Sequence, residues 1–229
     1  MVGFGGGSSY IALLAVAGTP YLLVPKISLV CNLLVVTGGC YHYWKKGYLK
    51  VKLAAPFVLS SVPFAFLGGA YPLQERTFMI LLTGSLFLAG LRILLIKGQE
   101  GSVVKAPPVW VSAVVGGLLG LLSGMVGIGG GIFLSPFMLN LKWAKAKEVA
   151  AISSAFIFLN SISGLAGQMT KGLSIPQFGP YLYLFAAVIL GGQIGSRVGT
   201  HQKISHLWVQ RGTGILILFV SLRLFIKVI

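Results

Sequence analysis

The chain has 229 residues, of which 56% are hydrophobic and 9% are charged, and its mean hydropathy is +0.92. Soluble domains carry about 25% charged residues, so this composition points to a membrane protein and away from a soluble domain. A net charge of +15 would also fit a nucleic-acid-binding protein. The basic residues, however, lie in short loops between apolar stretches, which is typical of membrane topology and not of a nucleic-acid surface.

Eight apolar stretches follow one another along the chain. They cover residues 7–22, 27–44, 53–72, 78–96, 109–141, 149–168, 177–196 and 207–226. Most approach the ~20 residues that a membrane-spanning helix needs. No basic segment precedes the first stretch, and no cleavage site followed by a soluble domain appears, so a removable signal peptide is not expected. We therefore expect an all-α, multi-pass integral membrane protein of the cell (plasma) membrane.

Two glycine-rich blocks interrupt these apolar stretches, VGFGGG at residues 2–7 and VGIGGG at residues 126–131. In lipid, an unpaired backbone group costs several kcal/mol, so a broken helix persists only where it packs in protein or faces a polar cavity. Paired helix breaks at matching places in two halves of a transporter indicate a binding site near the membrane midplane. The sequence thus predicts such a site.

The repeat extends beyond the glycines. Ile27-Ser28 matches Ile152-Ser153, and Lys46-Gly47 matches Lys171-Gly172, at a common offset of 125 residues. This predicts two homologous membrane repeats, residues 1–96 and 109–229, joined by a polar connecting loop at 97–108. Each repeat is expected to contain a glycine-broken re-entrant helix and three spanning helices.

The basic residues indicate how the two repeats are oriented. The apolar stretch 109–141 has 33 residues, too many for one ordinary span and too few for two. If it forms a re-entrant hairpin that turns at 127–131, 13 of the 18 basic residues fall on one side. The remaining five are Lys26, Arg76, Lys171, Arg223 and Lys227. A single crossing would split them ten to eight, so the positive-inside rule favours the hairpin, inverted-topology repeats and cytoplasmic basic loops.

The glycine block followed by an apolar half-helix and a proline, once per half, resembles the sulfite exporter TauE/SafE family, also called the TSUP family. The copy GIGGGIFLSP at 127–136 is the more typical one, and the resemblance covers essentially the whole chain. It implies transport of a small sulfur-containing or organic anion such as sulfite, a sulfonate or sulfoacetate. Members carry an apolar helix before the first glycine motif. The first half is therefore expected either to lack this opening half-helix or to begin upstream of Met1.

The residues themselves also favour an anion. A helix that begins at Gly7 or Gly131 directs free N–H groups and the positive end of its dipole into the break, and glycine lets a ligand approach the backbone closely. Serine hydroxyls near the breaks can add donors, and amides within the spans are costly in lipid. The predicted substrate-binding residues are Gly5, Gly6, Gly7, Ser8, Ser9, Asn32, Gly129, Gly130, Gly131, Ser135, Ser153 and Asn160. The alternative is that the glycines serve only close helix packing.

The small number of acidic residues limits the kinds of transport that the chain can perform. Only Glu75, Glu100 and Glu148 occur, and all map to loops or ends of spans. A cation pathway or a carboxylate proton relay places acids within the membrane, so neither is expected. The histidines lack zinc-ligand spacing, and no metal or other cofactor is expected.

These observations predict a secondary transporter that works by alternating access and not an enzyme, because the spans carry no nucleophile with a base. A passive anion channel stays open as the alternative. The expected partners are a small anionic substrate and the lipid bilayer, without nucleic acid. The sequence leaves open which anion is carried, the direction of flux, the coupling ion and whether a homodimer forms.

Overall fold

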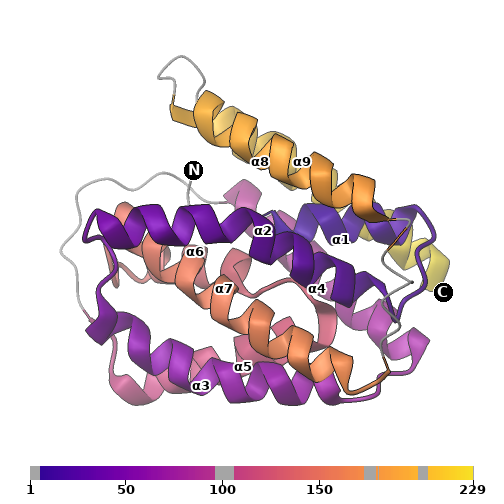
Figure 1. The fold of residues 1–229 in the computed structure, drawn as a ribbon, viewed down its shortest axis with the longest axis horizontal. Coiled ribbons are helices and arrows are strands. Elements are labelled where there is room, and N and C mark those ends of the chain that lie inside the picture. The colour runs from indigo at the N-terminus through magenta and orange to yellow at the C-terminus, as the bar shows by residue number, and fades with distance from the viewer. Residues whose placement is uncertain (1–5, 96–105, 173–178, 180, 201–205, 229) are drawn as a thin grey trace.

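The computed structural model describes residues 6–95, 106–172, 179, 181–200 and 206–228, with side chains outside the description at 95, 193–200, 206–210 and 227–228. Within these residues the regular elements are nine helices (Figure 1). They are α1 Gly7–Val16, α2 Val24–Lys45, α3 Val51–Ala70, α4 Glu75–Leu95, α5 Val109–Val126, α6 Gly131–Asn140, α7 Ala146–Met169, α8 Leu182–Thr200 and α9 His206–Val228. The prediction of an all-helical protein is confirmed.

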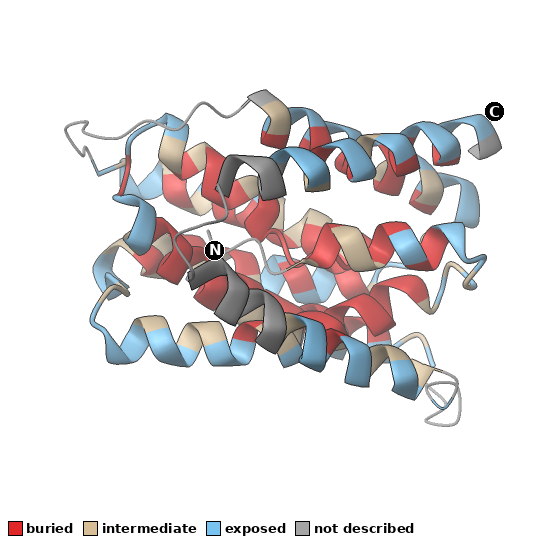
Figure 2. Ribbon diagram, turned by 90° about the horizontal axis from the view of Figure 1, so that it is seen from above, coloured by how far each residue is buried: buried red, intermediate tan, exposed pale blue. Residues whose placement is uncertain are grey.

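Five of the helices are long and apolar enough to cross a membrane within the described part of the chain: α2, α3, α4, α5 and α7. Their 18-residue windows have a mean hydropathy of 1.4 to 2.0. Many large apolar side chains on their outer faces are exposed, including Leu59 at 73% and Leu118 at 65%. Figure 2 shows exposed residues along the outer sides of the bundle and buried residues towards its middle. Such a surface is expected to face lipid.

Helices α1 and α6 are much shorter, with 10 residues each. At 1.5 Å per residue they cover about 15 Å, roughly half of the hydrocarbon thickness. A half-length helix after each glycine block agrees with the sequence-based expectation, although the apolar stretch 7–22 extends beyond the end of α1. Helix α1 ends at Val16 because Gly18 adopts a left-handed φ of 76° and Pro20 follows. Whether either short helix is re-entrant stays a prediction.

Helices α3 and α5 touch backbone to backbone. Gly116, Gly120 and Gly124 recur every fourth residue on the face of α5 that packs against α3. A Cβ atom on Gly120 would overlap the carbonyl oxygen of Ser61, and one on Gly124 would overlap that of Ala65. Small residues at this spacing let membrane helices approach closely. Helix α7 packs against both α3 and α5, so the three helices form a tightly packed unit.

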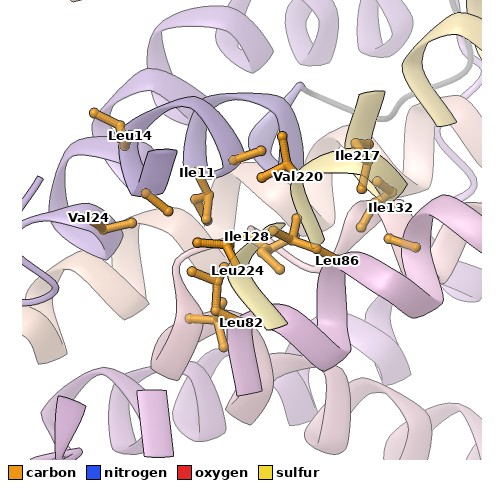
Figure 3. Packing of buried hydrophobic residues seen from close by; sticks show 14 of the residues in the cluster. Ile11, Leu14, Val24, Leu82, Leu86, Ile128, Ile132, Ile217, Val220 and Leu224 are labelled. Carbon is orange, nitrogen blue, oxygen red and sulfur yellow. The ribbon is translucent and has the colours of Figure 1, made fainter. Parts of the chain in front are cut away.

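The largest apolar cluster lies where the short helices meet the rest of the bundle. It joins Ile11 of α1, Val24 of α2, Leu82 of α4, Leu224 of α9 and Ile128, which precedes α6 (Figure 3). A second cluster lies around Phe57, Leu134 and Phe156 of α3, α6 and α7. The starts of α1 and α6 are thereby held in the interior of the bundle.

The helices fall into two series of similar lengths. Helices α1 to α4 have 10, 22, 20 and 21 residues, and α6 to α9 have 10, 24, 19 and 23. Corresponding members touch, since α2 packs against α7 and α4 against α9. Among the described residues, α5 has no counterpart ahead of α1.

Basic residues gather at the two ends of α2 and α7. At one end the Lys50 ammonium lies 2.7 Å from the Glu148 carboxylate, and the Lys147 ammonium lies 5.4 Å from the centre of the Tyr48 ring. These contacts join the loop between α2 and α3 to the start of α7. At the other end Lys26 Nζ, near the start of α2, donates a hydrogen bond to the carbonyl oxygen at residue 172, just after α7, at 2.8 Å. The two helices therefore run in opposite directions.

Candidate functional site

Both short helices begin at a glycine in the left-handed conformation. The N-cap of α1 is Gly6, with φ 76° and ψ 1°, and the N-cap of α6 is Gly130, with φ 74° and ψ −20°. In the connection from α5 to α6, Gly127 and Gly129 also have φ values of 84° and 83°. Residues other than glycine rarely adopt this conformation. The glycine blocks therefore fix where each helix breaks and where the next one begins.

The two breaks, which lie far apart in the sequence, meet at Asn32. A Cβ atom on Gly7 would overlap the carbonyl oxygen of Ile128 and lie 2.9 Å from Asn32 Oδ1. A Cβ atom on Gly129 would lie 2.8 Å from Asn32 Nδ2. Asn32 is fully buried in α2. The start of α1, the break before α6 and the Asn32 amide therefore form one compact site.

Helix α2 holds the second break in place through one face. Ser28 Oγ donates to the carbonyl oxygen of Gly127 at 3.0 Å, and Asn32 Nδ2 donates to that of Ile128 at 3.3 Å. Pro25, one turn before Ser28, packs so closely on Gly127 that a Cβ there would lie 2.5 Å from Pro25 Cα. These α2 residues share a face because they are three and four positions apart. The carbonyls of the broken segment thus gain partners, as burial in a membrane protein requires.

Each of the two helix starts has backbone amide groups that no N-cap side chain accepts from. Neither N-cap makes a side-chain hydrogen bond, and the first turns of α1 and α6 contain no acidic residue. The first N–H groups of a helix have no acceptor within the helix, and the dipole places partial positive charge there. Two such helix ends in one place form an arrangement suited to an anion.

Several buried polar atoms on α2, α5 and α7 have no hydrogen-bond partner among the described residues. They are Asn32 Oδ1, Ser123 Oγ, Asn160 Oδ1 and Nδ2, and Ser161 Oγ. An unpaired buried polar group costs about 1–3 kcal/mol. Such atoms concentrate where a protein binds a polar ligand or water.

Ser123 borders the second break, and Asn160 lies one helical turn beyond the α7 residues that contact it. A Cβ atom on Gly130 would lie 3.5 Å from Ser123 Cβ and 2.8 Å from Phe156 Cε1. Ile157, beside Phe156 on α7, approaches Gly129 in the same way, at 3.0 Å. Asn160 follows these two residues by one helical turn, on the same face of α7. It is fully buried, so its amide continues the polar lining away from the break.

The other predicted residues lie around this centre. Ser135 Oγ donates to Ser153 Oγ at 2.7 Å, and both residues are fully buried between α6 and α7. Ser8 is buried in the first turn of α1, and Ser9 is half-buried. Gly5 lies outside the described residues. The structure thus brings Asn32 together with the glycines, whereas Ser153, the α7 partner of Ser135, lies two turns before Asn160.

A shallow crevice lies beside the second break, on the side facing the end of the bundle opposite the Lys50–Glu148 pair. Its lining includes Pro25, Met125, Gln168 and Lys171. Lys26, only 3% exposed, lies at the same end. Burial lowers the pKa of Lys171 to about 8, and repulsion from the Lys26 ammonium contributes. Two lysines thus lie at the end of the bundle where the crevice is found.

A family model described as sulfite exporter TauE/SafE matches residues 1–224. The chain belongs to the sulfite exporter TauE/SafE family. A probable membrane transporter protein of Sinorhizobium fredii is 30% identical over 227 residues, which cover 97% of this chain and 91% of that protein. One from Haemophilus influenzae is 25% identical over 99% of this chain and 92% of its own length. No solved structure gave a significant match.

Family membership confirms the resemblance seen in the sequence. The protein is a multi-pass membrane transporter and not an enzyme. A third relative, from Bacillus subtilis, is also named a probable membrane transporter protein and is 26% identical over 86% of this chain and 82% of its own length. The names of these three relatives give no substrate.

Sequence reasoning missed several polar residues of this family member. Ser28 Oγ donates to a carbonyl of the second break, and Gln168 Nε2 donates to a carbonyl near the end of α5 at 2.8 Å. Ser123 and Ser161 are buried without a partner among the described residues. The repeat itself contained one signal, because Ser28 corresponds to the predicted residue Ser153. Ser123 and Ser161 gave no clear signal, because a serine within a span more often bonds its own helix backbone.

Proposed function

We propose that this transporter carries a small sulfur-containing or organic anion, such as sulfite, a sulfonate or sulfoacetate, by alternating access. The observation that carries the proposal is that the start of α1 and the break directly before α6 meet at Asn32. There the first N–H groups of α1 and α6 can donate to one anion, and the glycines let it approach the backbone. Ser123, Asn160 and Ser161 supply further polar contacts.

We also propose that α1–α4 and α6–α9 are inverted-topology repeats and that α5 and α6 form a re-entrant pair. Their matching lengths support this, as does the packing of α2 on α7 and α4 on α9, because equivalent elements meet at a two-fold axis. The proposed repeats correspond to residues 1–96 and 109–229, with 97–108 connecting them.

The basic loops are proposed to be cytoplasmic, in the cell membrane. Lys50 and Lys147 lie together at one end of the bundle and Lys26 and Lys171 at the other, which supports the charge split behind this orientation. Labelling of single cysteines at positions 142 and 171 with an impermeant reagent tests it. We expect only position 171 to react from outside the cell, and the reverse result would overturn the orientation.

A carrier fits the burial of the site better than a channel does. Asn32, Asn160 and Ser161 have no exposed surface. A channel needs an aqueous path that is open to both sides at once, whereas a carrier closes its site in part of its cycle. All of these groups come from one chain, and formation of a homodimer stays a prediction.

The crevice is proposed as the route between the site and the Lys171 end. The ammonium groups of Lys26 and Lys171 attract an anion to this end. Pro25 and Met125 line the crevice, and Pro25 also contacts Gly127 of the second break. A small movement of α2 against α5 would therefore open the site towards these lysines.

Flux through purified protein in proteoliposomes tests the proposal. We expect saturable uptake of radiolabelled sulfite that is accelerated by unlabelled sulfite on the opposite side. Gly130→Val should abolish it, because a β-branched residue disfavours φ 74° and its Cβ would lie 2.8 Å from Phe156. Gly38→Ala is the matched control, since nothing lies within 4 Å of its added methyl. Uptake that is linear in concentration and indifferent to counter-substrate would indicate a channel. Absence of flux for sulfite, sulfonates and carboxylates would refute anion transport.

A further inference from the structure

The positive potential at the site has a limited magnitude. Each helix N-terminus acts as about half an elementary charge, so α1 and α6 together supply roughly one. The side chains at the site, Asn32, Ser123, Asn160 and Ser161, are neutral. Lys26, on the same helix as Asn32, donates its ammonium to a carbonyl beyond α7 and so points away. One negative charge is therefore compensated, while a second would be buried without a partner, which is strongly unfavourable.

The amide of Asn32 adds a second constraint. Its Nδ2 group donates to the carbonyl oxygen of Ile128 at 3.3 Å. Turning the amide over would bring Oδ1 against that oxygen, two acceptors facing each other, so the hydrogen bond fixes the orientation. Oδ1 then faces Gly7 at the start of α1, where it is buried without a donor among the described residues. A carbonyl oxygen at this place repels a bare oxyanion but accepts a hydrogen bond from an O–H group.

From these two observations we infer that the site selects a singly charged anion that brings its own hydrogen-bond donor. A protonated oxyanion such as hydrogensulfite fits, as does a sulfonate with a hydroxyl group, whereas the sulfite or sulfate dianion does not. The amides of α1 and α6 donate to the charged oxygens, and the ligand O–H donates to Asn32 Oδ1. This inference rests on the proposed function and specifies the substrate class of the same site.

Two pairs of probe anions separate charge from hydrogen bonding in titrations of the purified wild-type protein. Methanesulfonate and sulfate have similar shapes and differ in charge, and we expect methanesulfonate to bind at least about tenfold more tightly. Isethionate and 1-propanesulfonate have equal charge and similar length, but only isethionate has a hydroxyl group. One additional hydrogen bond predicts roughly three- to tenfold tighter binding of isethionate.

The pH dependence of sulfite binding gives a third measurement. From about pH 5.5 to about pH 7.5, the apparent affinity for sulfite should fall as hydrogensulfite loses its proton. Methanesulfonate, whose charge is constant in this range, serves as the control and should bind equally throughout. An affinity for sulfite that rises with pH would overturn the inference.

In Asn32→Leu the preference for isethionate over 1-propanesulfonate should fall to about one. This ratio is read within the variant, because losing the hydrogen bond to Ile128 is expected to weaken binding of both anions. Asn140→Leu, at the exposed end of α6, is the control and should keep the preference. If the Asn32 variant does not fold, the wild-type pairs still decide. Equal binding of all four anions would refute this inference but leave anion transport standing. Binding of none would refute the proposed function itself.

Discussion

Replacing Gly7 by alanine adds a single methyl group at the point where the two breaks meet. Gly7 is the first residue of α1 and is not among the residues with positive φ, so alanine is compatible with its backbone. The added methyl would, however, overlap the carbonyl oxygen of Ile128 and lie 2.9 Å from Asn32 Oδ1. Ordinary contacts need roughly 3.5 Å, so α1 must move away from the second break.

The size of the effect follows from two terms. Inserting a methyl group into a well-packed interior costs about 1–3 kcal/mol of folding free energy. An anion that loses one of two helix N-termini loses up to about 2 kcal/mol of binding free energy, which corresponds to a rise in Kd of up to about 30-fold. Gly7→Ala should therefore weaken anion binding strongly and lower the unfolding temperature modestly.

The assay is titration of Gly7→Ala with methanesulfonate, beside a thermal melt in the same detergent. Gly38→Ala is the control because it adds the same methyl to α2, the helix of Asn32, with nothing within 4 Å. It should bind like the wild type. Wild-type affinity in Gly7→Ala would mean that the starts of α1 and α6 do not share one ligand, and the site described above would then be wrong.

Three further predictions concern the scaffold, the lysines and the acids. Gly120→Leu should prevent folding, because its side chain would overlap the carbonyl of Ser61, whereas Gly84→Leu, with nothing within 4 Å of its Cβ, should express normally. The pKa of Lys171 is lowered to about 8, largely by burial and then by repulsion from Lys26. Uptake from that end should therefore fall between about pH 7 and about pH 9 in the wild type but not in Lys171→Gln. The pKa of Lys171 in the folded protein lies below the usual ~10.4, so the protonated side chain destabilises the fold at neutral pH. This destabilisation is lost as the pH rises above about 8. We therefore expect Lys171→Gln to have a higher unfolding temperature than the wild type at pH ~7. Replacing all three acids by glutamine should leave anion binding within about twofold. Loss of proton-coupled uptake with binding intact would instead identify a coupling carboxylate. The acids are Glu75, Glu100 and Glu148.

The sequence predicted the breaks because their physics is local. Glycine triplets in apolar sequence have few structural uses in lipid, and their recurrence identified both helix starts at Gly7 and Gly131. Asn32 was predicted because an amide is costly in a span, and it does lie between the breaks. Its orientation could not be predicted, since it depends on a hydrogen bond to Ile128 that only the tertiary fold brings into reach.

Packing between helices was less accessible to sequence reasoning. Gly116, Gly120 and Gly124 are the clearest packing glycines in the described chain, yet their role depends on which helix lies opposite. By contrast, glycines recur at the same spacing in α8, at 191, 195 and 199, yet nothing lies within 4 Å of a Cβ on Gly191. The sequence did not show where α1 ends, because apolar residues continue past Gly18 although the helix ends at Val16.

The most direct test of the central claim is to locate a bound anion by anomalous diffraction. Crystals grown with bromomethanesulfonate would mark the ligand by its bromine atom while keeping a single negative charge. We expect one strong anomalous peak beside Asn32, between the starts of α1 and α6, that is absent in Gly130→Val. Peaks confined to the basic loops or to the crevice at Lys171, with none at Asn32, would contradict an anion site at the paired helix breaks.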